Sequence, residues 1–86
     1  MAAGVDAGGL SPERRSRLQI DIARAHTQRR HLGDATEALL EAERLAPEQV
    51  RTHAFARDTI RDLLSLGGRR ASPELLDLAR RSGILL

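Results

Sequence analysis

Three histidines, at positions 26, 31 and 53, are the side chains in this 86-residue chain that could transfer protons near neutral pH or bind a transition metal. His26 and His31 are five residues apart, a spacing that places them on different sides of a helix. No HExxH-type pair is present. The sequence therefore predicts no metal site. We expect His26 to pack at a helix seam and His31 to lie in a turn near Asp34.

The other residue types give little support for catalysis. The chain has no cysteine, no glycine-rich phosphate loop and no strand-to-helix turn that would expose a serine nucleophile. Ser65 and Ser72 are explained by their positions, at a predicted helix end and a predicted helix start. The acidic residues are spaced with arginines as on solvated helix faces. We predict no catalytic residues, no cofactor and a protein that is not an enzyme.

Arginine carries all of the positive charge outside the histidines. Fourteen arginines and no lysine oppose 12 acidic residues, for a formal net charge of +2. Pairs such as Arg29-Arg30, Arg69-Arg70 and Arg80-Arg81 could contact phosphates, for which the guanidinium group is well suited. The balancing acids and the single aromatic residue argue against nucleic-acid binding. An Arg-rich nucleic-acid-associating accessory domain therefore stays the alternative function.

The apolar pattern has a helical period throughout and predicts four helices with no strands. Residues 1–10, small and glycine-rich, are expected to be a flexible lead-in or linker remnant, and residues 11–86 one domain. Gly83 is placed for the left-handed residue that ends the last helix, with Ile84 packing back onto it. The predicted helices run from Ser11 to about Arg30, from Asp34 to Pro47, from a start between Glu48 and Thr52 to Leu66, and from Leu75 to Ser82.

The first two predicted helices are joined by only about three residues, so they must form an antiparallel hairpin. Asp34 and Glu37 resemble a capping box at the start of the second helix. Six arginines lie in residues 10–33 and five acids in residues 34–48, so we expect ion pairs across the hairpin as well as within helices. The predicted packing positions are Leu18, Ile22, Ala35, Leu39, Ala42, Phe55, Ile60 and Leu63.

Residues 16–49 resemble one tetratricopeptide (TPR) repeat of 34 residues. Ile22-Ala23 stand at the large–small pair of the first helix, Ala35 at the small residue of the second, Leu39 at the usual aromatic position and Pro47 at the closing proline. Small residues at a helix crossing allow a close approach of the two axes. The second half of the chain does not follow the pattern and is expected to be a cap.

The resemblance to a TPR repeat implies a ligand-contacting stripe on the first helix. The corresponding positions are Arg17, Asp21, Arg24 and Gln28, which are spaced i, i+4, i+7 and i+11. Such a stripe could hold a peptide carboxylate or an acidic segment. The alternative is a solvated face on which Arg17 and Arg24 both pair with Asp21.

The stretch from about Arg17 to Leu85 is similar to the C-terminal region of actinobacterial XRE-family helix-turn-helix transcriptional regulators. The segments ARAH, ALLEAERLAP and ASPEL carry this resemblance. In these regulators an N-terminal DNA-binding domain precedes a TPR-like helical region, which implies a sensing, dimerisation or protein-contact module. The hairpin around Gly33 is itself too long in its helices to be a DNA-reading helix-turn-helix.

Together these features predict an all-α fold in which a TPR-like hairpin, residues 16–49, precedes two capping helices, residues 50–86. One repeat hairpin does not bury its apolar stripe alone. We therefore expect a protein partner or a homo-oligomer, with DNA contact only indirect or weak. No signal peptide or membrane-length apolar run is present, so a cytoplasmic location is expected. The leucines expected to stay partly exposed are Leu40, Leu66, Leu76, Leu85 and Leu86.

Overall fold

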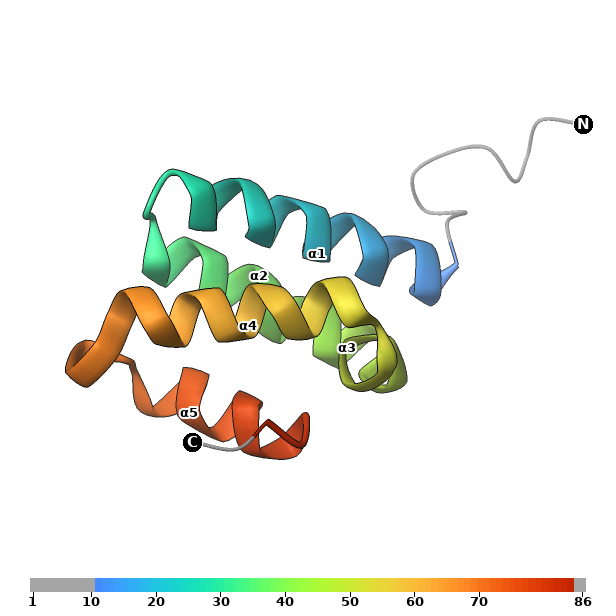
Figure 1. Cartoon of the computed structure of the whole chain (residues 1–86). Coiled ribbons are helices and arrows are strands. Elements are labelled where there is room, and N and C mark those ends of the chain that lie inside the picture. The colour runs from blue at the N-terminus through green and yellow to red at the C-terminus, as the bar shows by residue number, and fades with distance from the viewer. Residues whose placement is uncertain (1–10, 85–86) are drawn as a thin grey trace, which may run out of the picture.

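Helices make up nearly all of the chain between residues 11 and 84, which are the residues that the computed structural model describes. No strand occurs among them, so the predicted all-α class is confirmed. The predicted lead-in over residues 1–10 and the predicted exposure of Leu85 and Leu86 lie outside the described residues. The elements are α1 (Pro12–Gln28), α2 (Leu32–Leu45), α3 (Pro47–Thr52), α4 (Ala54–Gly67), a 3₁₀ turn (Gly68–Arg70) and α5 (Pro73–Arg81) (Figure 1).

The described residues contain five α-helices rather than the four predicted, because the expected third helix is broken at His53. His53 has an extended backbone, with φ −81° and ψ 116°, between α3 and α4. The Thr52 hydroxyl donates a 2.6 Å hydrogen bond to the Glu48 carbonyl, a local bond that competes with helix continuation. The short α3 buries Val50 completely and turns the chain from α2 into α4.

Helix α4 lies against both members of the α1–α2 hairpin, and α5 packs against α4 and α2 (Figure 1). Arg57 of α4 joins the ends of two other helices. Its guanidinium donates hydrogen bonds to the carbonyl of Arg51 in α3, at 3.2 Å, and to the carbonyl of Ser82 after α5. The carbonyls at helix C-termini carry partial negative charge, so a cation is favourable there.

The apolar stripe that α1 turns toward the core is not the one that the sequence predicted. Leu18 and Ile22, both expected as packing residues, are 51% and 37% exposed. Ile20 and Ala23 are fully buried in their place. The prediction chose the stripe with the larger aliphatic side chains, whereas the close α1–α2 crossing requires the stripe with smaller ones.

Ser16 and Thr27 complete the buried stripe of α1, and their hydroxyls have partners. The Ser16 hydroxyl donates a 2.8 Å hydrogen bond across the hairpin to the carbonyl of Ala42 in α2. The Thr27 hydroxyl donates a 2.7 Å bond to the Ala23 carbonyl one turn earlier. A buried hydroxyl without a partner would oppose folding, so these two bonds make the polar stripe compatible with the core.

The remaining predicted packing positions lie in or against the core. Phe55 is partly buried and packs against the core, and the leucines at 40 and 76 are also partly buried. Leu66 stays 41% exposed, as expected. The predicted positions that are fully buried are Ala35, Leu39, Ala42, Ile60 and Leu63.

The turn between α1 and α2 has an arginine at its left-handed position. Arg30 has a φ of 62°, in the left-handed region. The Arg30 amide donates to the Thr27 carbonyl at 3.0 Å, and the His31 amide donates to the His26 carbonyl at 2.8 Å. These two bonds are those of a Schellman helix ending. Gly33 therefore does not terminate α1.

The predicted capping box at the start of α2 is wrong. The helix begins at Leu32, two residues before Asp34, and its N-cap is His31, which makes no side-chain capping bond. The Schellman ending completes the turn early, because its left-handed residue directs the chain straight into the next helix. Asp34 is consequently the third residue of α2 and lies in its first turn.

The ending of α5 confirms the prediction made for Gly83. This residue has a φ of 75°. Its amide donates to the Arg80 carbonyl at 3.0 Å, and the Ile84 amide donates to the Ala79 carbonyl at 2.9 Å. Ile84 is only 7% exposed and joins the core. The chain thus contains the same ending twice, once with glycine and once with arginine at the left-handed position.

Because α1 buries Ile20 and exposes part of Ile22, the same substitution by alanine should have unequal effects at the two positions. Ile20→Ala should lower the free energy of unfolding by about 2–4 kcal/mol, because it opens a cavity in a filled core. Ile22→Ala should change it by less than about 1 kcal/mol, because the side chain lies at the surface and its truncation leaves no enclosed cavity. Urea denaturation of both variants measures the difference. Equal losses, or a larger loss for Ile22→Ala, would show that α1 buries the other stripe.

The two Schellman endings predict opposite effects of substitution at their left-handed residues. Left-handed angles cost a non-glycine residue about 1–2 kcal/mol, and glycine loses roughly 0.5–1 kcal/mol more backbone freedom on folding. Arg30→Gly should therefore raise the free energy of unfolding by about 0.5–1 kcal/mol.

Gly83→Ala is the matched control and should lower the free energy of unfolding by about 1 kcal/mol. A Cβ at this position would meet only the Arg57 guanidinium at 3.9 Å, so the loss would be conformational and not a steric clash. Thermal unfolding of the two variants beside the parent chain measures both changes. A destabilised Arg30→Gly variant would contradict the assignment of the turn.

Candidate functional site

The stripe implied by the TPR resemblance lies on the side of α1 that faces α4. All four of its residues are exposed. The Arg24 guanidinium lies over the ring of Phe55 in α4, with its central carbon 4.2 Å from the ring centroid. Such a cation–π contact links the two helices at the surface. Arg24 and Gln28 of the stripe therefore border α4, whereas Arg17 and Asp21 are exposed nearer the start of α1.

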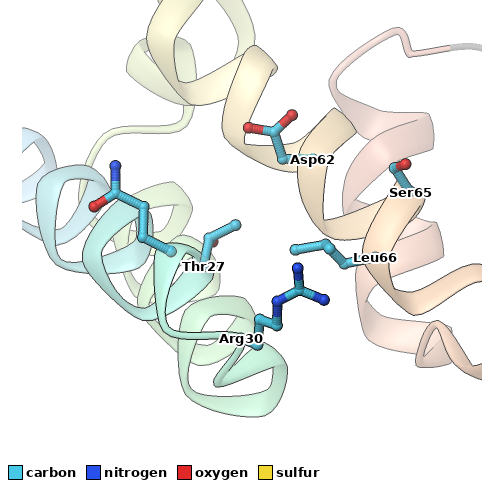
Figure 2. A pocket seen from close by; sticks show the side chains of 6 residues that line it. Thr27, Arg30, Asp62, Ser65 and Leu66 are labelled. Carbon is cyan, nitrogen blue, oxygen red and sulfur yellow. The ribbon is translucent and has the colours of Figure 1, made fainter.

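A shallow groove of about 310 Å³ lies between the end of α1 and α4. In Figure 2, Arg30 reaches from the end of α1 toward Leu66 of α4. The groove offers a cation, a carboxylate, hydroxyl groups and an apolar side chain, which is the mixture found at the rims of protein interfaces. Its lining residues are Thr27, Gln28, Arg30, Asp62, Ser65 and Leu66.

The ion pairs between residues 11 and 84 all lie on α2, α4 and α5. Three of them join residues one turn apart on one helix: Arg44 with Glu41, Arg61 with Asp58, and Arg80 with Asp77. The fourth joins α5 to α2 through Arg81 and Glu43. The expected pairing within helices is confirmed, whereas no ion pair of the described chain crosses from α1 to α2.

The Arg81–Glu43 pair is the least exposed of the four. Two guanidinium N–H groups donate to the two carboxylate oxygens, each at 2.8 Å. The Glu43 side chain is only 15% exposed. These hydrogen bonds raise the pKa of Arg81. On the exposed face of α2, the hydrogen bond from Arg44 similarly holds the pKa of Glu41 below its ordinary value. Glu41 and Glu43 of α2 thus pair with arginines on α2 and α5, and no carboxylate of α2 forms an ion pair with α1 within the described residues.

The arginines of α1 and its following turn have no carboxylate partner within the described residues. The alternative that Arg17 and Arg24 both pair with Asp21 is therefore wrong. The short Asp21 side chain points away from the core on the same face, while Arg24 lies over Phe55 instead. The unpaired arginines are Arg14, Arg15, Arg17, Arg24, Arg29 and Arg30.

Sequence reasoning missed an exposed surface on the side of α1 that lies opposite its buried stripe. Leu18, Ile22 and Ala25 follow one another at i, i+4 and i+7 and are all exposed. Arg15 and Arg29 lie at the two ends of this line. We call these five residues the α1 outer face. The signal that would have found it is the competing stripe of small residues, which matches the alanines of α2 better.

Three comparisons, with protein-family models, with curated proteins and with solved structures, found no match. Among residues 11–84, no helix has the length and apolar character needed to cross a membrane. The functional argument therefore depends on the surfaces of the described residues.

The contact between Arg24 and Phe55 predicts an energetic coupling between α1 and α4. In a double-mutant cycle of Arg24→Ala and Phe55→Leu, the coupling free energy should be about 0.5–1 kcal/mol, as for exposed cation–π pairs. The matched control is Arg17→Ala combined with Phe55→Leu, which should show no coupling because Arg17 lies two turns away on α1. Urea denaturation supplies all of the values. Additive losses in the Arg24 cycle would show that Arg24 and Phe55 do not stabilise the α1–α4 interface together.

Proposed function

We propose that this chain is a non-catalytic module that binds a partner protein through the α1 outer face. The observation that carries the proposal is the 51% and 37% exposure of Leu18 and Ile22 in the middle of a well-formed helix. Full burial of a large aliphatic side chain is worth about 1.5–3 kcal/mol. A partner that covers both residues would therefore gain a substantial part of its binding free energy from them.

The partner that best fits this face is an amphipathic helix with acidic flanks. The line of Leu18, Ile22 and Ala25 has the spacing by which one helix packs along another. Arg29 forms no ion pair within the described chain, and Arg15 acts on Glu41 through its charge without forming an ion pair, so both guanidinium groups can attract acidic groups of a partner. An antiparallel copy of the same face would place these arginines against each other, which disfavours self-pairing through α1.

The proposed setting is a bacterial transcriptional regulator in the cytoplasm. The resemblance of the ARAH, ALLEAERLAP and ASPEL segments to XRE-family regulators supports this setting. The packing of α4 on both α1 and α2, and of α5 on α4 and α2, supports a TPR-like interpretation, since stacked helical hairpins contact their neighbours in this way. In that setting the module would dock on another part of the regulator and would have no DNA-reading element of its own.

The second candidate function is nucleic-acid association, and the unpaired arginines of α1 and its turn favour it. Guanidinium groups without carboxylate partners are free to contact phosphates. The aliphatic line in the middle of the same helix favours a protein instead, because phosphate backbones offer no surface to cover it.

Substitution on the α1 outer face tests the docking function. The probe is a fluorescein-labelled synthetic helix with leucines on one face and glutamates on the other. We expect the parent chain to bind it, and the Leu18→Glu/Ile22→Glu double variant to bind at least about tenfold more weakly, since acidic groups then face an acidic probe. Fluorescence anisotropy measures the affinity. Thermal unfolding should show that the variant remains folded, because both side chains are exposed.

Leu66→Glu is the matched control, because it changes another exposed leucine outside the α1 outer face and should leave probe binding unchanged. Equal binding by the parent chain and the double variant would contradict the proposal.

A gel shift with random duplex DNA distinguishes nucleic-acid association, the second candidate function, from binding of a partner protein. DNA affinity that falls steeply with salt and survives the double variant would favour nucleic-acid association. Sedimentation at several concentrations reports self-association.

A further inference from the structure

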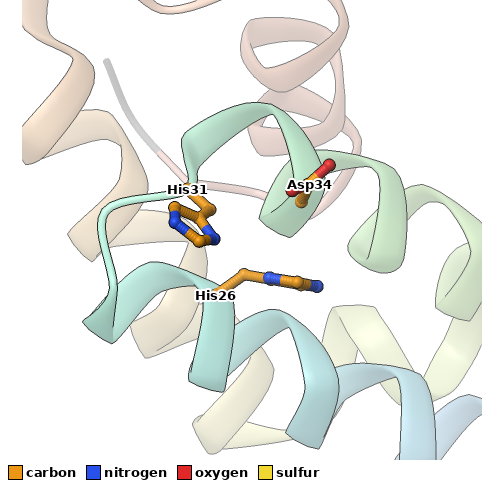
Figure 3. A group of neighbouring side chains, drawn as sticks. All are labelled: His26, His31 and Asp34. Carbon is orange, nitrogen blue, oxygen red and sulfur yellow. The ribbon is translucent and has the colours of Figure 1, made fainter.

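Two histidines and an aspartate meet at the corner where α1 turns into α2 (Figure 3). The possible ligand atoms of His26, His31 and Asp34 all lie within 4.8 Å of one another. His31 lies in the turn near Asp34, as expected, but the five-residue spacing does not separate it from His26 as it would on one continuous helix. Because α1 ends at Gln28, His31 is outside the helix, and its ring centroid lies 5.9 Å from that of His26.

The backbone of the turn fixes this cluster. In the Schellman ending of α1, the His26 carbonyl accepts a hydrogen bond from the His31 amide, and the side chains at these two positions normally make contact. His31 is at the same time the N-cap of α2, and Asp34 is the third residue of that helix. The N-cap and third positions are those that face each other in a capping box. One residue, His31, therefore belongs to both motifs and brings the other two side chains together.

The three side chains have no other partner among the described residues. None of them forms a side-chain hydrogen bond or an ion pair between residues 11 and 84, and the N-cap side chain makes no capping bond. His26 is half-buried, whereas His31 and Asp34 are exposed. The cluster is thus open to solvent on one side and supported by packing on the other.

We propose that this corner binds one Zn²⁺ ion through His26, His31 and Asp34. Imidazole nitrogens and a carboxylate oxygen are ordinary zinc ligands, with bonds of about 2.0–2.2 Å. Tetrahedral ligands at that distance are about 3.4 Å apart. The present separations are all within 4.8 Å, and rotation of the exposed His31 and Asp34 side chains would bring the ligand atoms to coordination distance. Three protein ligands leave a fourth position for water or for a donor from a partner.

The end of α1 and the charge of Asp34 favour a cation at this corner, against the opposing dipole at the N-terminus of α2. His26 lies in the last turn of α1, where the helix dipole favours positive charge. The nearby Arg30 side chain is directed to the α1–α4 groove, toward Leu66 (Figure 2). Asp34 supplies a negative charge to the set. The ion would join the end of α1 to the first turn of α2 and so staple the hairpin, in a domain small enough to gain from such a link.

Isothermal titration of the untagged chain with ZnCl₂ tests the site. We expect one Zn²⁺ per chain, and a rise in Tm of at least about 4 °C at saturating zinc. Titration with Mg²⁺ should give no binding, because Mg²⁺ prefers sets of oxygen ligands. Addition of Co²⁺ should produce the visible absorption of a low-symmetry site, which reports the coordination directly.

Single substitutions distinguish this site from scattered surface binding. His31→Gln and Asp34→Asn should each weaken zinc binding at least about tenfold, whereas removal of the histidine outside the cluster, by His53→Gln, should leave it unchanged. Both His31 and Asp34 are exposed, so these variants should remain folded. Absence of zinc binding by the parent chain, or binding that survives both His31→Gln and Asp34→Asn, would overturn the proposal.

Discussion

The close crossing of α1 and α2 through small side chains is the constraint on which the other packing depends. Ser16, Ala23 and the alanines of α2 let the two backbones approach until the Ser16 hydroxyl reaches the Ala42 carbonyl at 2.8 Å. Once that face of α1 is committed to the crossing, Leu18 and Ile22 must point outward. The same orientation places Arg24 over Phe55 of α4. The core and the outer surface of α1 are therefore two results of one packing choice.

Electrostatics follow this packing and do not direct it. Glu41 and Glu43 of α2 pair with Arg44 on the same helix and with Arg81 on α5, and the arginines of α1 form no ion pair with the described carboxylates. A surface ion pair is worth little, so the apolar crossing decides the orientation. The result is a helix with unpaired positive charge around an aliphatic line. Apolar area and charge on that helix thus favour the same type of partner, one that is both apolar and acidic.

Local backbone geometry explains the corner between α1 and α2. A left-handed Arg30 ends α1 within two residues, and α2 begins at Leu32. This compact turn makes His31 both the last residue of one motif and the first of the next. The zinc set proposed there does not depend on the docking function, since it lies at the end of α1 and not along its outer face. Each proposal can therefore fail without affecting the other.

The sequence by itself determined the features that depend on local interactions. These are the all-helical class, the Ser11 and Ser72 caps, and the left-handed Gly83 with Ile84 packed back. Tertiary structure decided which stripe of α1 is buried, because helical period alone allows either stripe and only the partner helix distinguishes them. It also decided the break at His53, where no proline or glycine marks the chain, and the approach of His26 to the turn of His31 and Asp34, which requires a left-handed Arg30 that local propensity does not reveal.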